Sequence, residues 1–188
     1  MDRKKIEDLT YAGIFGAISF LLMAFAQFPI VPGYNFLRFD PGEAPALLVG
    51  LVKGPRVGFM AVVIKDLLYL LFRAKSPFGP AADFFACSTF VVITSVILKR
   101  GTTSGRRIFS AALMATLARI LIMIPGNVLI LGLQFGYSFG QVLETFWPVI
   151  VPFNVVKSLT NTVLALPLVL YLSRHGIAPK TSIAKPNQ

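Results

Sequence analysis

Four ionisable side chains interrupt the long apolar stretches of this sequence, and they are the residues best placed to do chemistry. Lys65 and Asp66 are neighbours in one stretch, whereas Arg119 and Lys157 stand alone in two later ones. A charge at bilayer depth costs at least about 2.5–3.5 kcal/mol on insertion scales, so each residue needs a partner or a function. Asp66 could neutralise Lys65 or Arg119 across helices. Alternatively, these charges could act as an ion relay.

The residues around Lys157 form a polar stripe. Helical spacing places four polar side chains on one face: Asn154, Lys157, Ser158 and Asn161. Amide, ammonium and hydroxyl groups within an apolar helix could join two helices, or they could line a ligand pocket. Pro152 favours the pocket, because proline weakens the backbone hydrogen-bond ladder beside the stripe.

A second polar break occurs at Pro125-Gly126-Asn127. A helix kink with a satisfied amide is one interpretation. Two polar breaks at a similar depth favour a pocket shared by their helices. Asp83 could face the same pocket, but its position just after Gly79-Pro80 makes a helix cap the preferred interpretation.

The loop Pro32 to Pro41 mixes aromatic rings with hydrogen-bonding groups. This combination suits a flat heteroaromatic ligand better than an ion or a sugar, although the rings could instead form an interfacial belt. Together, the loop and the two polar breaks give eight candidate ligand contacts: Leu37, Phe39, Asp40, Asp83, Asn127, Asn154, Lys157 and Ser158.

The elements that position these residues must be membrane helices. Hydrophobic residues make up 55% of the chain, charged residues 14%, and the mean hydropathy is +0.74, whereas a soluble domain has about 25% charged residues. Uncharged runs such as Ile120 to Leu143 are long enough to cross the bilayer, which takes about 20 residues. Charges, prolines and glycines delimit six segments: 9–29, 42–53, 55–74, 80–98, 107–133 and 148–173. We therefore predict an all-α polytopic membrane protein, with a six-transmembrane-helix bundle at 1–175 and a flexible cytoplasmic tail at 176–188.

The segment 42–53 is too short to cross a bilayer alone, since it would span only about 18 Å. Neighbouring helices could shield it, or the preceding loop could dip into the membrane to meet it. Short segments of this kind often mark the binding sites of transporters.

The positive charges are distributed unequally between the two sets of loops. Twelve Lys and Arg residues fall in one set and three in the other. This asymmetry predicts that both termini are cytoplasmic and that the number of crossings is even, in a cell membrane. The net charge of +10 is then a topology signal, and no nucleic-acid partner is expected.

Several chemistries are disfavoured. Cys87 and His175 are the only residues of their types, so an internal disulfide is excluded and a Cys/His zinc site is not expected. The sequence has no Walker-type phosphate loop and no His/Asp/Glu cluster, which argues against an ATPase or another enzyme. We expect no resident cofactor.

The first helix carries two overlapping pairs of small residues. Ala12 pairs with Gly16, and Gly13 pairs with Ala17, at the four-residue spacing that lets another helix approach closely. These four residues are candidates for docking a partner.

Taken in order, several of these motifs resemble the substrate-binding S-components of energy-coupling factor (ECF) transporters, in particular the riboflavin-specific ones. The resemblance covers about residues 9–174. It rests on the small-residue first helix and on three motifs: Phe36 to Pro41 running into Glu43-Ala44-Pro45-Ala46-Leu47, Pro125-Gly126-Asn127, and Phe153-Asn154-Val155-Val156-Lys157.

The resemblance implies a six-helix bundle that binds riboflavin, or its phosphate ester FMN, near the outer surface. The loop containing Asp40 would act as a lid, and Asn127, Asn154 and Lys157 match ligand-contacting positions of the family. The first helix would dock a transmembrane coupling subunit that carries two ATPases. The main alternative is a secondary transporter or channel, which predicts charges lining a through-path and flux without ATPases.

Overall fold

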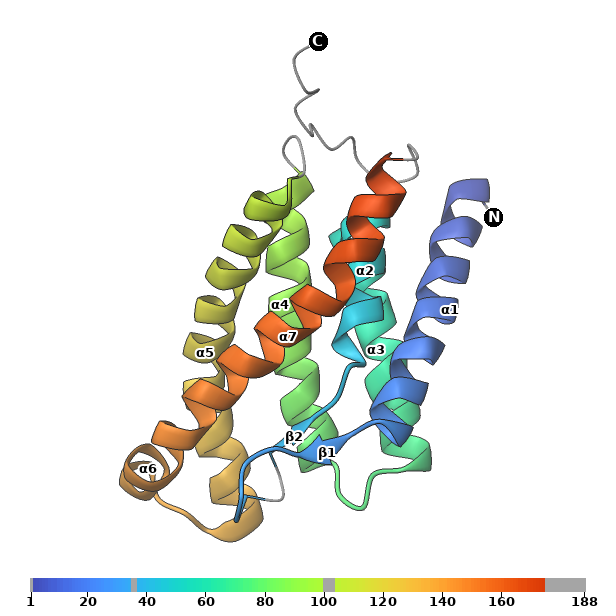
Figure 1. Ribbon diagram of the computed structural model, residues 1–188. Coiled ribbons are helices and arrows are strands. Elements are labelled where there is room, and N and C mark those ends of the chain that lie inside the picture. Colours follow the sequence, from blue (N-terminus) through green and yellow to red (C-terminus); the bar gives the residue numbers. More distant parts are fainter. Residues whose placement is uncertain (1, 35–36, 100–103, 175–188) are drawn as a thin grey trace.

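The computed structural model describes residues 2–34, 37–99 and 104–174, which form a helical bundle (Figure 1). In chain order its elements are α1 (Arg3–Phe25), β1 (Phe28–Pro29), β2 (Arg38–Phe39), α2 (Glu43–Lys53), α3 (Pro55–Phe72), α4 (Phe78–Lys99), α5 (Gly105–Phe135), α6 (Phe139–Gln141), the π-helix η1 (Val142–Phe146) and α7 (Trp147–Arg174). Each predicted segment overlaps one of the helices α1 to α5 and α7. The tail predicted at 176–188 lies outside the described residues.

Four helical runs of the described residues are long and apolar enough to cross a membrane: α1, Phe78–Leu98, α5 and Phe139–Leu172. Large apolar side chains of α5, such as Leu121 and Leu133, are exposed, as expected of a surface that faces lipid. The beginning of α1 and the end of α7 lie at the same end of the bundle (Figure 1). The count of six crossings and the cytoplasmic side remain predictions from the sequence.

The short helix α2 lies in the centre of the bundle, where it contacts α1, α3, α4 and α7. Its side chains are buried on nearly every side, and even Glu43 at its first turn is fully enclosed. The loop before it also enters the bundle, because Asp40 is only 2% exposed. Neighbouring helices therefore shield the short segment, and the loop and the helix together carry ionisable residues into the interior.

Glycines allow α2 and α3 to form a tight hairpin. Gly54 joins them with φ of 107°, a conformation that side chains rarely adopt. A Cβ on Gly58 would lie 2.7 Å from Cα of Gly50, so the two backbones touch. This close crossing brings the charged face of α3 next to the start of α2.

Small residues of α1 serve the contact between α1 and α3. Ala12 and Gly16 are buried, and a Cβ on Gly16 would lie 2.8 Å from Cβ of Ile64. This pair, predicted to meet a partner, is instead packed inside the chain. Gly13 and Ala17 are half-buried, and a Cβ on Gly13 would meet nothing within 4 Å. Of the two pairs predicted to dock a partner, the second is therefore the one that is partly exposed.

Strands β1 and β2 cover the end of the bundle opposite the chain termini (Figure 1). We call the described residues between Phe28 and Pro41 the lid. Its two strands pair antiparallel with Phe28 opposite Phe39, and their rings lie 5.6 Å apart. The lid contacts the far ends of α5 and α7 through a second apolar cluster, which includes Leu37, Leu131 and Phe146. Short irregular segments therefore enclose this end of the bundle.

Candidate ligand site

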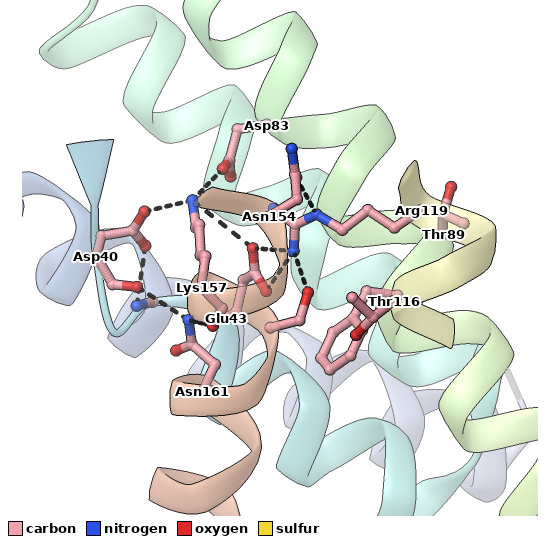
Figure 2. Close-up of polar contacts among 12 residues, drawn as sticks. Asp40, Glu43, Asp83, Thr89, Thr116, Arg119, Asn154, Lys157 and Asn161 are labelled. Atoms are coloured by element: carbon pink, nitrogen blue, oxygen red, sulfur yellow. Dashed lines mark hydrogen bonds and ion pairs between the residues drawn. The ribbon is translucent and has the colours of Figure 1, made fainter. Parts of the chain in front are cut away.

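A fully enclosed ion pair connects α2 and α5. Nη1 of Arg119 donates to the two carboxylate oxygens of Glu43 at 2.8 and 2.9 Å (Figure 2). The guanidinium also donates to Oδ1 of Asn154 at 2.8 Å and to Oγ of Ser158 at 3.2 Å. Glu43 and Arg119 are at most 1% exposed, so each neutralises a charge that water cannot reach.

Lys157 joins three further elements. Its ammonium group lies 2.8 Å from the carboxylate of Asp40 before α2, and 2.6 Å from that of Asp83 on α4. Glu43 is 3.6 Å away. Nδ2 of Asn161 donates to the backbone carbonyl of Asp40 at 3.2 Å (Figure 2). The loop before α2 is thus fixed to α7 by a charged and a neutral contact.

Asp83 lies in the second turn of α4, so the prediction that it caps the helix is wrong. Helix α4 begins at Phe78, and the Asp83 side chain binds the ammonium groups of Lys65 and Lys157. Asp66 lies beside Lys65 at 3.2 Å, whereas Arg119 pairs with Glu43. Of the two partners considered for Asp66, the structure selects Lys65.

A cavity of about 120 Å³ lies beside this network, at the lid end of the bundle. Apolar and polar side chains from the lid, α4, α5 and α7 share its lining. They include Leu37, Phe78, Ala82, Asp83, Arg119, Met123, Asn127, Ile130, Leu131, Gln134, Ile150, Phe153, Asn154 and Lys157. The carbon-rich walls with a few polar groups on one side are typical of a site for a small organic molecule.

Five of the eight candidate residues line this cavity: Leu37, Asp83, Asn127, Asn154 and Lys157. The other three lie behind it. Phe39 packs on Phe28, Asp40 binds Lys157, and Ser158 binds Arg119. These three shape the site from outside its wall.

The polar residues of the cavity differ in how far the protein already satisfies them. The amide of Asn154 donates to the carbonyl of Ile150 and accepts from Arg119. The ammonium of Lys157 is paired with the carboxylates of Asp40 and Asp83. The half-buried amide of Asn127 has no hydrogen-bond partner in the described ranges, so it is available to a ligand. Asn154 and Lys157 therefore line the cavity and also connect α7 to other elements, so the polar stripe fits both of its interpretations.

Sequence reasoning missed three polar residues: Glu43 in the inner ion pair, and Arg38 and Gln134 in the cavity lining. Glu43 begins a short helix after a polar loop, a position that usually faces water, and its partner Arg119 is 76 positions away. Gln134 stands in the uncharged end of α5 and reaches the cavity only because α5 continues past Pro125 to Phe135. One signal for Glu43 was available, because an unmatched Arg119 requires a buried carboxylate.

Comparisons with known proteins agree with one another. The family model described as "ECF transporter, substrate-specific component" matches residues 7–169. The chain is 26% identical over 174 residues to the riboflavin transporter RibU of Staphylococcus aureus (strain TCH60), covering 89% of this chain and 91% of that protein. It is 28% identical over 170 residues to the riboflavin transporter FmnP of Bacillus subtilis (strain 168), covering 85% and 88%.

Solved structures give the same result. The chain resembles the S component of a bacterial ECF transporter with a TM-score of 0.79 and 26% identity, over 91% of this chain and 98% of that one. ThiT from Listeria monocytogenes has a TM-score of 0.69 at 16% identity, over 94% of this chain and 100% of that one, and supports the fold alone.

Proposed function

Because the chain belongs to the family of substrate-specific components of ECF transporters, we propose that it is the riboflavin-binding subunit of an ATP-driven vitamin importer in the plasma membrane. It captures the vitamin at the outer face, and a coupling subunit with two ATPases supplies the energy for uptake. FMN, which shares the isoalloxazine ring, is the second ligand to test. Two relatives that match most of the chain are riboflavin transporters, which supports this choice.

The observation that carries the proposal is the cavity beneath the lid. Its apolar wall, which includes Met123, Ile130 and Phe153, suits the ring system of a flavin. The open amide of Asn127 would hydrogen-bond a polar edge of the rings or the ribityl chain. Arg119 is neutralised by Glu43 in the interior, which supports a charge-balancing role rather than an ion relay.

The size of the cavity implies that the lid opens. A volume of about 120 Å³ is below the roughly 300–1,000 Å³ of ordinary ligand pockets. Leu37, on the lid, lines the cavity and packs against Leu131, Ile150 and Phe153. Riboflavin would therefore enter by displacing the lid from this apolar cluster, and the lid would close again over the bound rings.

The direct test is to purify the chain in detergent and titrate it with riboflavin, following quenching of flavin fluorescence. We expect saturable binding with one site per chain, and a parallel titration with FMN ranks the two ligands. A chain that is folded and monodisperse but binds neither flavin would refute the proposed substrate.

Asn127→Ala should weaken riboflavin binding by about fivefold, because a hydrogen bond in an enclosed site contributes about 1 kcal/mol. Fluorescence titration measures this change. Gln27→Ala is a matched control, since Gln27 has the same amide chemistry but bonds Tyr69 and lies outside the cavity. Equal effects of the two substitutions would contradict the assignment of Asn127.

The coupling subunit would dock on the half-buried face of α1 that carries Gly13 and Ala17. Small residues at this spacing let a partner helix approach closely within the bilayer. Exposed apolar side chains, including Leu9, Ile14 and Leu21, are also available on α1. Ala12 and Gly16 would act indirectly, because they fix α1 against α3.

Gly13→Leu should preserve riboflavin binding but abolish co-purification with the coupling subunit and vitamin uptake. The added side chain meets open space within the chain, so it blocks only a partner. Gly16→Leu should instead lower the yield of folded protein, because it strikes Ile64. If Gly13→Leu forms the complex and transports normally, α1 docks through another face or not at all.

A further inference from the structure

A second hollow lies on the outer surface of the bundle, between α3, α4 and α5. It is an open groove of about 550 Å³, within the roughly 300–1,000 Å³ of ordinary ligand pockets. Residues of α4 line it from Ser88 to Val96, which is about 12 Å along the helix axis. Phe59 of α3 and Ile122 of α5 flank this stretch, and the surface inside the groove is almost entirely apolar. The groove shares no described lining residue with the cavity beneath the lid.

The exception to this apolar lining is a positive charge at one end of the groove. Arg56, in the first turn of α3, is exposed, and its side chain has no ion pair or hydrogen bond with any described residue. Neither the described lining nor the first turn of α3 contains an acidic side chain. Lys53, just before α3, pairs with Glu7 of α1, which places this end of the groove on the side of the bundle where the chain begins. The groove therefore combines a long apolar wall with one uncompensated cation.

We propose that this groove binds a phospholipid with a negatively charged headgroup, taken from the leaflet on the side of the chain termini. The phosphate lies at Arg56, and one acyl chain follows α4 toward Ser88. Three side chains that line the groove, Phe59, Val96 and Ile122, are exposed on a surface that faces lipid. A headgroup without net charge gains less from Arg56, so the site selects anionic lipid.

An acyl chain fits this groove better than a partner helix. Close helix packing in a bilayer uses small residues four positions apart, as at Gly13 and Ala17 on α1. The described lining contains no such pair, because α4 presents branched side chains here, including Val92 and Ile93. A flexible hydrocarbon chain can follow that uneven wall. Helix α1, where the coupling subunit would dock, does not line the groove.

Native mass spectrometry of the delipidated protein tests the inference without riboflavin. The two probes are dioleoyl phosphatidylglycerol and dioleoyl phosphatidylcholine, which have the same acyl chains but differ in net charge. The first phosphatidylglycerol molecule should bind about fivefold more tightly than phosphatidylcholine, the gain expected from one arginine beside an anionic lipid. Arg56→Gln should remove this preference without affecting folding, because it replaces an exposed side chain. Arg3→Gln is the matched control, since Arg3 is also exposed but lies outside the groove lining.

Val96→Trp tests the position of the acyl chain. The larger ring should occupy the groove and weaken binding of both lipids, and the fold should tolerate it because Val96 is exposed. Thermal unfolding in detergent checks that the variant is folded.

Three results would overturn the inference. Equal affinity of the wild type for the two lipids would remove the selection of charge. A preference for phosphatidylglycerol that survives Arg56→Gln, or that Arg3→Gln removes equally, would place the headgroup elsewhere. A folded Val96→Trp that binds both lipids like wild type but no longer co-purifies with the coupling subunit would show that a protein occupies the groove.

Discussion

Glu43→Ala is expected to lower the free energy of unfolding by about 3–5 kcal/mol, because it leaves the guanidinium of Arg119 buried without its carboxylate. The loss of stability involves more than the contact between Glu43 and Arg119. Arg119 also holds Asn154 and Ser158, so an unbalanced guanidinium would disturb two residues of α7 as well. Thermal unfolding in detergent, followed by circular dichroism or light scattering, measures the effect.

Glu7→Ala is the matched control for this prediction. Glu7 also pairs with a cation, Lys53, but its side chain is 51% exposed, so water and salt screen the charge. We expect this variant to melt close to wild type. A double variant, Glu43→Leu with Arg119→Met, should recover part of the stability lost in Glu43→Ala, since it removes both charges. Equal melting of Glu43→Ala and Glu7→Ala would contradict the structural role of the inner pair.

The positions of the long helices could be predicted because each leaves a strong local signal. The apolar run in α5 is uncharged from Ile120, and Gly54-Pro55 separates α2 from α3. The π-helix and the two-residue strands of the lid leave none, because segments of a few residues are too short for a periodic pattern. Their conformation depends on what they pack against.

The candidate site was predictable in its residue types and less so in its pairings. The polar stripe of α7 is visible at helical spacing, and Asn154 and Lys157 indeed reach the cavity. Which cation meets which carboxylate depends on the hairpin of α2 and α3, where Gly50 and Gly58 touch. Glu43 at the start of α2 meets Arg119 of α5, and no local sequence pattern specifies this pairing.

The multiple partners of Lys157 change how a loss of binding at this residue should be interpreted. Lys157→Ala would remove a group that lines the cavity and would also unpair Asp40 and Asp83. A weaker affinity could then reflect a lost ligand contact or a detached lid. Asp40 separates these effects, because it binds Lys157 but lies outside the cavity lining.

Asp40→Ala should therefore increase the rate of riboflavin release by about 30-fold, which corresponds to the roughly 2 kcal/mol lost when one partner of a buried charged pair is removed. Asp40 holds the chain segment that follows β2 against α7. Its carboxylate accepts from Lys157 and from the N–H of Gly42, and its backbone carbonyl accepts from Asn161. Stopped-flow recovery of flavin fluorescence after dilution measures the release rate.

The riboflavin release rates of three variants show whether loss of the Asp40–Lys157 ion pair causes the faster release. Asp40→Asn keeps an acceptor for Gly42 but loses the charge that Lys157 needs, so its release rate should lie between those of wild type and Asp40→Ala. Asp2→Ala removes an exposed carboxylate at the far end of α1 and should release riboflavin like wild type. If Asp40→Ala binds less riboflavin at equilibrium but releases it at the wild-type rate, the ion pair of Asp40 with Lys157 affects ligand entry instead of release. An unchanged rate and affinity would mean that the apolar contacts of Leu37 hold the lid closed without the ion pair.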